Sequence, residues 1–213
     1  MNSKILGIVK NLSYTFVANI VGTLLSVVLV ALVPKRLGAA EYGYWQLYVF
    51  YTTYVGFFHF GWVDGILLRY GGREYEELDK PLFHSQFWML GAMELVITLL
   101  FSGGILVFYA HADKTFVLLM TALCCLLVIP RTFLQYVLQS TNRIQEYAKN
   151  QMAEKVIYAA AVVILLLAGT SSYESLLLAD IGAKLVTLCT LCWRCRDIVF
   201  HKAAGLRESL AEA

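Results

Sequence analysis

The sequence predicts an all-α protein that crosses a membrane several times. Of its 213 residues, 59% are hydrophobic and 15% are charged, and the mean hydropathy is +0.66. A soluble domain is only about 45–50% apolar and about 25% charged. No segment shows the alternating pattern of an outer-membrane barrel strand. A net charge of +2 is too small to indicate a nucleic-acid partner.

Six apolar segments approach the length of about 20 residues that a bilayer-crossing helix needs. The fifth segment is short, and a start one turn earlier, near Gln151, is an alternative. We predict a six-span transmembrane lobe over residues 1–196 and a cytoplasmic tail over 197–213. The tail is either an interfacial amphipathic helix with Val199, Ala203 and Leu206 on its apolar face or a solvated segment. The predicted spans are 16–34, 44–60, 86–109, 115–139, 156–169 and 175–193.

The distribution of basic residues predicts the orientation of these spans. Twelve of the 17 Lys and Arg residues lie in the two termini and in the second-to-third and fourth-to-fifth connections. The other connections hold only Lys35, Arg36 and Lys114. Because cytoplasmic loops are enriched in Lys and Arg, we expect an inner-membrane protein with both termini in the cytoplasm. The loop RYGGREYEELDK (69–80), whose paired glycines interrupt helices, would then be solvated and cytoplasmic.

Polar residues inside the spans are the strongest functional evidence, because ionisable groups in lipid usually face a bundle interior or a water-filled cavity. In the fourth span, Arg131, Gln135, Gln139 and Asn142 fall within about 80° of one another on a helical wheel. The amides could bind neighbouring helices together. Arg131 is more costly to bury, which favours a role at a substrate path.

The first span has a milder polar face, formed by Thr15, Asn19, Thr23 and Ser26 with Gly22 on its flank. Small and hydroxyl residues commonly serve close packing between helices in membranes. Packing is therefore the favoured interpretation. Asn19 is the candidate substrate contact.

Two carboxylates are candidates for coupling to an ion. Asp180 and Lys184 in the sixth span are four residues apart, the spacing of a neutralising pair on one helix face. Asp180 could instead exchange a proton or hold a cation. Glu94 in the third span would be protonated or paired at its depth, and we expect Arg131 to be its partner.

The second span carries four aromatic residues, Tyr44, Tyr48, Tyr51 and Phe58, within about 80° on a helical wheel. Stacked rings can line a sugar path, although packing and interfacial anchoring are commoner uses. Of the five cysteines, Cys195 is expected to be the most accessible. His59 is interpreted as a helix-end residue.

The sequence contains no motif that indicates catalysis. HExxH, GxSxG and Walker A patterns are absent, and CTLCWRC lacks a fourth ligand at the spacing of a metal site. We therefore expect no catalytic residues, no metal and no cofactor, and we expect that the chain is not an enzyme.

Four segments together resemble a known family. The clearest is LGAAEYG (37–43), between the first two spans. The others are KNLSYTFVANIVG (10–22), FGWVDGILLRYGG (60–72) and LQSTNRIQEYAKNQMAEKVI (138–157). They are similar to the N-terminal part of the oligosaccharide flippase family, the Wzx-type branch of the multidrug/oligosaccharidyl-lipid/polysaccharide exporter superfamily.

The resemblance implies a transporter that moves lipid-linked oligosaccharide, carried on a polyprenyl diphosphate, across the inner membrane by alternating access. Its fold would have two six-helix lobes, so a second six-span lobe or a homodimer partner is expected besides the bilayer. By this resemblance Arg131 and Lys184 would bind the phosphates, and Asn19, Gln135, Gln139 and Tyr48 would line the path. Two rivals remain. One is a drug or cation antiporter using Asp180 and Glu94, and the other is a non-transporting assembly partner.

Overall fold

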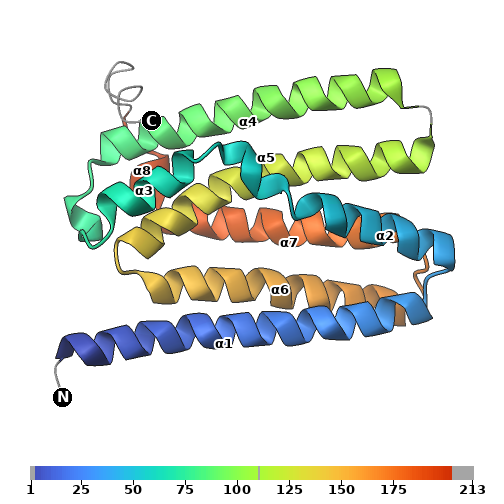
Figure 1. The fold of residues 1–213 in the computed structure, drawn as a ribbon, viewed down its shortest axis with the longest axis horizontal. Coiled ribbons are helices and arrows are strands. Elements are labelled where there is room, and N and C mark those ends of the chain that lie inside the picture. Colours follow the sequence, from blue (N-terminus) through green and yellow to red (C-terminus); the bar gives the residue numbers. More distant parts are fainter. Residues whose placement is uncertain (1–2, 110, 203–213) are drawn as a thin grey trace.

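The computed structural model describes residues 3–109 and 111–202 and shows a bundle of long helices (Figure 1). The described residues contain no strand, so the all-α prediction is confirmed. The helices are α1 (Ser3–Leu32), α2 (Ala39–Thr52), α3 (Trp62–Tyr70), α4 (Lys80–Phe108), α5 (Ala112–Ser140), α6 (Ile144–Leu167), α7 (Tyr173–Arg194) and α8 (Arg196–Val199). Three short 3₁₀ segments, η1 (Val33–Lys35), η2 (Val55–His59) and η3 (Tyr75–Glu77), connect them.

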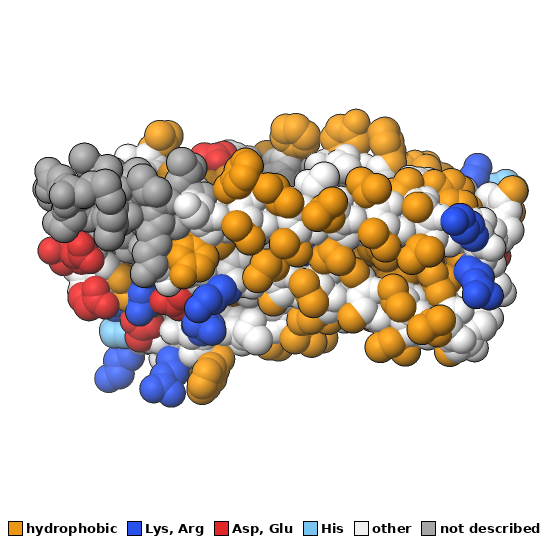
Figure 2. Space-filling model, turned by 90° about the horizontal axis from the view of Figure 1, so that it is seen from below, with side chains coloured by type: hydrophobic (Ala, Val, Ile, Leu, Met, Phe, Trp, Pro, Cys, Tyr) orange, Lys and Arg blue, Asp and Glu red, His pale blue; other side chains and the backbone are white. Residues whose placement is uncertain are grey.

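Five stretches of helix are long and apolar enough to cross a membrane: Ser13–Lys35, Lys80–Phe108, Ala112–Ser140, Ile144–Leu167 and Tyr173–Arg194. Figure 2 shows the matching surface pattern on one face, where hydrophobic side chains cover the middle and most charged side chains lie toward the two ends. A multi-pass membrane protein needs such an apolar band between polar ends. The first, third, fourth and sixth predicted spans correspond to four of these stretches.

Helix α5 is the centre of the bundle. Most of its side chains are buried, and it contacts α4, α6, α7 and the α2–α3 segment. Helix α6 packs against α7, and α1 lies at the outer edge, where its main neighbour is α6 (Figure 1). The start of α1 and helix α8 lie at the same end of the bundle (Figure 1).

The second predicted span, 44–60, is not one helix. Helix α2 ends at Thr52, η2 follows, and α3 starts only at Trp62. The backbone turns through the left-handed region at Phe60 (φ 49°) and Gly61 (φ 82°), a conformation that glycine adopts without strain. The interrupted segment still follows α5 from one end of the bundle toward the other (Figure 1). Irregular backbone at membrane depth is tolerated where protein covers it or where it lines a cavity.

The fifth predicted span starts too late. Helix α6 begins at Ile144, whereas the predicted span began at residue 156. Its first half is polar, and local hydropathy therefore placed it in a loop. Ala148 and Asn150 in that half are buried, so packing within the bundle stabilises the helix. Lys149 and Lys155, which the sequence pattern assigns to a loop, are helical.

The 69–80 segment is anchored to the end of the bundle that carries α8. As predicted, the paired glycines follow directly after α3, which ends at Tyr70. Tyr75 is buried, and its hydroxyl donates to Asp197 Oδ1 at 2.8 Å. Lys80 Nζ lies 3.1 Å from Asp197 Oδ2. Most of the segment is nevertheless exposed, as its composition indicated, and only Tyr70, Tyr75 and Leu78 are buried.

The end of α8 is held by α4. Trp88 Nε1 donates to the carbonyl of Val199 at 3.0 Å, and His84 Nδ1 lies 3.0 Å from the carbonyl of Ile198. Val199, expected on the apolar face of an amphipathic tail, is buried. The rest of that predicted face, Ala203 and Leu206, lies outside the described residues.

Candidate functional site

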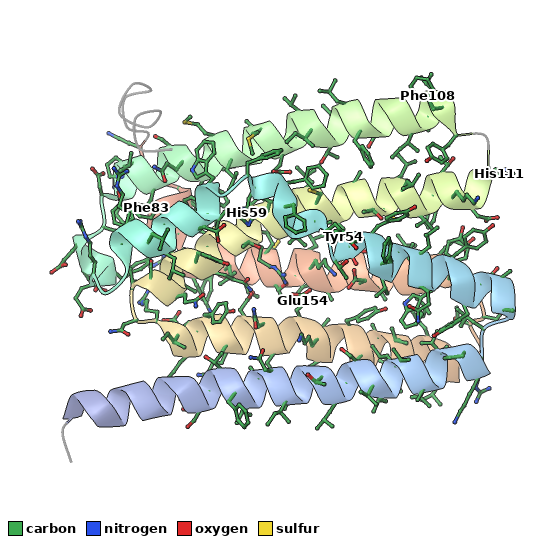
Figure 3. The ribbon with its side chains drawn as sticks, in the orientation of Figure 1. Tyr54, His59, Phe83, Phe108, His111 and Glu154 are labelled. Carbon is green, nitrogen blue, oxygen red and sulfur yellow. The ribbon has the colours of Figure 1, made fainter. Side chains whose placement is uncertain are left out.

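Four ionisable side chains from three helices meet inside the bundle. Arg131 of α5 forms an ion pair with Glu154 of α6, and Lys184 of α7 forms one with Asp180. The two pairs are joined, because Lys184 Nζ lies 3.6 Å from Glu154 Oε1. Figure 3 shows Glu154 between α6 and α7 in the middle of the bundle. We call Arg131, Glu154, Asp180 and Lys184 the charge cluster.

The charge cluster lies far from both ends of the membrane-crossing helices. Lys184 is near the midpoint of α7 (Tyr173–Arg194), about 15 Å from either end at 1.5 Å per residue. The four side chains are only 10–17% exposed. Isolated charges are costly at this depth. Two cations beside two anions remove most of that cost, provided that their remaining polar atoms are hydrogen-bonded.

A network of neutral polar side chains surrounds the charge cluster. Tyr48 of α2 donates to Asp180 Oδ2 at 2.6 Å, and Arg131 Nη1 donates to Thr187 Oγ1 at 3.4 Å. Gln135 Nε2 donates to Asn150 Oδ1 at 2.9 Å. Asn150 in turn donates to the carbonyl of Thr187 at 3.0 Å. Helices α2, α5, α6 and α7 are therefore tied together by polar contacts at one depth.

Part of this site was predicted from the sequence. The pair of Asp180 and Lys184 is confirmed, and Thr187 continues the same helix face into the cluster. Gln135 is buried beside the cluster, as the stripe on the fourth span predicted. Tyr48 is also part of the site, although as a partner of Asp180 and not on an open path.

The predicted pairing of Glu94 with Arg131 is wrong. Glu94 of α4 is fully buried and accepts a bond from Cys125 Sγ at 3.3 Å, while its Oε1 has no partner in the described part of the chain. Arg131 binds Glu154 instead. The reason is geometric, because Cys125 and Arg131 are six residues apart and therefore point about 120° apart around α5. Glu94 thus lies on a different side of α5 from the cluster.

Other candidate residues lie away from the cluster. Asn19 is exposed on α1, and Gln139 is only partly buried near the end of α5. Asn142 lies beyond α5, in a left-handed conformation (φ 62°), and is exposed. Phe58 belongs to η2, so it does not share a helix face with Tyr48. The substrate roles predicted for Asn19, Gln135, Gln139, Tyr48, Arg131 and Lys184, and the ion-coupling roles of Asp180 and Glu94, stay predictions.

Sequence reasoning missed Asn150 and Glu154, the two residues that α6 contributes. The sequence pattern assigns both to the fourth-to-fifth connection. Their spacing of four residues puts them on one helix face, and this signal would have revealed them had the helix been extended toward its N-terminus. Without Glu154, Arg131 had no nearby acidic partner, and it was therefore assigned to Glu94.

A second feature is an apolar cavity of about 470 Å³ on the other side of α5. It lies among α2, η2, α4 and α5, and its walls are mainly aromatic and aliphatic. Cys125, the donor to Glu94, forms part of its wall. The lining residues are Phe50, Tyr51, Tyr54, Val55, Phe58, Ile97, Thr98, Phe101, Tyr109, Leu118, Thr121, Ala122 and Cys125.

The cysteine predicted to be accessible is not. Cys195 is fully buried at the end of α7, and burial raises the pKa of its thiol to about 11. Cys189 is the exposed cysteine of the described chain. His59 ends η2 and accepts a bond from the Gly61 amide at 3.1 Å, as expected of a helix-end residue.

Comparison with known proteins gives one family. Residues 8–211 match the model of the family described as polysaccharide biosynthesis protein. No curated protein and no solved structure matches the chain. The match covers nearly the whole sequence, including every helix that contributes to the charge cluster. The chain therefore belongs to the polysaccharide biosynthesis protein family.

Proposed function

We propose that this chain is a component of a transporter that flips lipid-linked oligosaccharide, a polysaccharide repeat unit on a polyprenyl diphosphate carrier, across the inner membrane. The observation that carries the proposal is the family match over residues 8–211 in a chain with five membrane-length apolar helices. The described part of this chain contains no separate water-soluble domain. Work on a membrane-embedded, lipid-linked intermediate is the function that suits it.

The charge cluster supports a rigid-body role for these helices. Its two cations are neutralised by Glu154 and Asp180, so they offer no excess positive charge to an anionic substrate. Breaking such buried pairs is costly. The cluster therefore holds α2, α5, α6 and α7 together as one unit, which is what alternating access needs from each lobe. Binding of phosphate by Arg131 or Lys184 would require these pairs to open.

The proposal includes a second half, either another six-span lobe or a second copy of this chain. Transporters that alternate between two open states move one bundle or repeat against another around a midplane site. We expect both termini of this chain in the cytoplasm, in keeping with the distribution of Lys and Arg. We also expect the chain to act without covalent catalysis.

Deletion of the gene in its host tests the function directly. We expect loss of surface polysaccharide and accumulation of lipid-linked repeat units on the cytoplasmic leaflet, where a glycosidase or lectin applied to inside-out vesicles detects them. Re-expression of the chain should reverse both effects. If repeat units fail to form at all, the chain acts in their synthesis, and the transport proposal is wrong.

One observation favours a second candidate function, a proton-coupled exporter of a different cargo. Glu94 is fully buried, has one oxygen without a partner in the described chain and touches the wall of the apolar cavity through Cys125. Intramembrane carboxylates often serve as proton relays. In that case Glu94→Gln would abolish export of an apolar cation while leaving surface polysaccharide unchanged.

A further inference from the structure

Lys155 is a positive charge outside the charge cluster. It lies near the midpoint of α6 (Ile144–Leu167), about 17 Å from either helix end. Its neighbour Glu154 points into the bundle, but Lys155 itself is exposed. Within residues 13–109 and 111–202, it forms no ion pair or hydrogen bond. The four charges of the cluster balance one another, so Lys155 adds an unbalanced positive charge at the same depth.

The side chain of Lys155 lies in a notch on α1. A Cβ atom added at Gly22 would overlap its Cδ, Cε and Nζ atoms, so a larger residue at position 22 would displace the end of the lysine side chain. The exposed side chains of Asn19, Thr23 and Ser26 lie along the same side of α1. Thr23 and Ser26 donate to backbone carbonyls at 2.9 Å. Gly22, on the flank of this polar face, therefore packs against the lysine side chain.

A lysine in this position is costly to place among acyl chains. Lysines near helix ends reach the membrane surface with their long side chains, but a residue at mid-helix is too far from either end. Its charge therefore requires water or an anion beside it. The surface where α1 meets α6, at Lys155, Gly22 and Asn19, is consequently a candidate site for an anion.

We propose that Lys155, placed by Gly22 and flanked by Asn19, binds the diphosphate of the lipid-linked substrate. This inference rests on the proposed function and assigns its anion-recognition site to the outer α1–α6 surface. The charge cluster is then a supporting structure beside the site. A phosphate oxygen would accept a hydrogen bond from the Lys155 ammonium, and the Asn19 amide, which has no partner in the described chain, would donate a second one.

Binding by the purified full chain in lipid nanodiscs tests this site. The probe is undecaprenyl diphosphate, compared with undecaprenol, which lacks the charge. The variants are Lys155→Gln, Lys155→Arg and Gly22→Ala, which would push the lysine out of its notch. The matched controls are Lys149→Gln, an exposed lysine on the same helix, and Gly182→Ala, where an added Cβ meets no atom within 4 Å.

We expect the wild type to prefer the diphosphate to undecaprenol. Lys155→Gln should weaken diphosphate binding about tenfold or more, because a charge-assisted hydrogen bond is lost, and it should leave undecaprenol binding unchanged. Gly22→Ala should weaken diphosphate binding as well, whereas Lys155→Arg and both controls should bind like the wild type. Competition by inorganic pyrophosphate should be weak, because the lipid chain contributes to binding.

Three other results would contradict the Lys155 site, the lipid-linked ligand or the proposed transport function. If Lys155→Gln binds the diphosphate like the wild type while gene deletion still causes repeat units to accumulate, the site is wrong and the proposed function stands. If inorganic pyrophosphate binds as tightly as the lipid, the site takes a free anion and the lipid-linked assignment is wrong. If the wild type binds neither lipid and deletion has no effect on polysaccharide, both proposals fail.

Discussion

The ammonium of Lys184 lies 3.6 Å from the carboxylate of Glu154, which also pairs with Arg131. One acidic side chain on α6 thus neutralises cations from two other helices. Its loss would leave two buried positive charges with only Asp180 between them. Glu154 is therefore the residue on which the charge cluster depends most.

Glu154→Gln should destabilise the protein by about 3–5 kcal/mol, the usual cost of removing one partner from a buried ion pair. The measurement is thermal unfolding in detergent, together with abundance in the membrane fraction. Glu146→Gln is the matched control, because Glu146 lies on the same helix but is more exposed, near the end that carries α8. Equal stability of the two variants would contradict a supporting role for the cluster.

Arg131 can be tested for a substrate role separately from a supporting one. We expect Arg131→Ala to lower abundance in the membrane, because Glu154 would lose its nearest cation. The double variant Arg131→Gln with Glu154→Gln should recover part of that abundance by restoring neutrality. If the double variant is abundant and transports normally, Arg131 has no substrate role. If it is abundant but inactive, the phosphate-binding prediction for Arg131 gains support.

Much of this site could be predicted from the sequence because helix geometry is local. The spacing of Asp180 and Lys184, or of Arg131 and Gln135, fixes which side chains share a helix face. The partner of Arg131 depends instead on which helices are neighbours around α5. Helix order in a bundle is a tertiary property, and no spacing along the chain encodes it.

The two wrong spans have a common physical cause. Hydropathy averages over a window, so it merges α2 and η2 into one span despite Gly56 within it. It also excluded the polar first half of α6, although Asn150 and Glu154 are satisfied by partners within the bundle. A polar residue that is paired inside a protein costs little in a membrane, and composition alone does not show which residues are paired.

The contact between Tyr75 and Asp197 should be insensitive to pH over the physiological range. Burial raises the pKa of the Asp197 carboxyl, but hydrogen bonds from the Tyr75 hydroxyl and Lys80 lower it by more. The pKa of Asp197 therefore lies below its usual value of 3.8. Burial, with Cys195 and Asp197 nearby, raises the pKa of Tyr75 above 10. The stabilisation from Asp197 is therefore lost only as the pH falls below about 3.8, and that from Tyr75 only above about pH 10.

Thermal unfolding of the wild type and of Asp197→Asn from pH 3 to pH 9 measures this dependence. The difference between the two proteins should be constant from pH 5 to pH 9 and should shrink at the acidic end, where protonation removes the charge of Asp197. Glu76→Gln, at an exposed position in the same segment, is the control. A difference that disappears near pH 6 would show that the carboxyl is not held by Lys80 and Tyr75.

Impermeant thiol labelling on intact cells tests the orientation. Glu76 and Lys114 are both exposed and lie at opposite ends of α4 and α5. In a variant without the native cysteines, we expect a single cysteine at Lys114 to be labelled from outside and one at Glu76 to be protected. Permeabilised cells should label both. Labelling of Glu76 alone in intact cells would reverse the predicted topology.

The last prediction concerns whether this chain works alone. A single lobe in lipid would be expected to expose the polar stripes of the fourth and sixth predicted spans, which are Arg131, Gln135, Gln139, Asp180 and Lys184. The structure instead buries Arg131, Gln135 and Asp180 and leaves Gln139 and Lys184 partly buried. The chain expressed by itself should therefore reach the membrane at normal abundance. It should nevertheless fail to restore surface glycan to a flippase-deficient strain, because the outer α1–α6 surface at Lys155 needs a second wall to enclose a substrate path. Co-expression of a second six-span segment should restore the glycan.

Self-association of this chain would be the alternative source of the second wall, and cross-linking at Asn19, which is exposed, would detect it. Full complementation by a demonstrably monomeric 213-residue chain would refute the need for a second half.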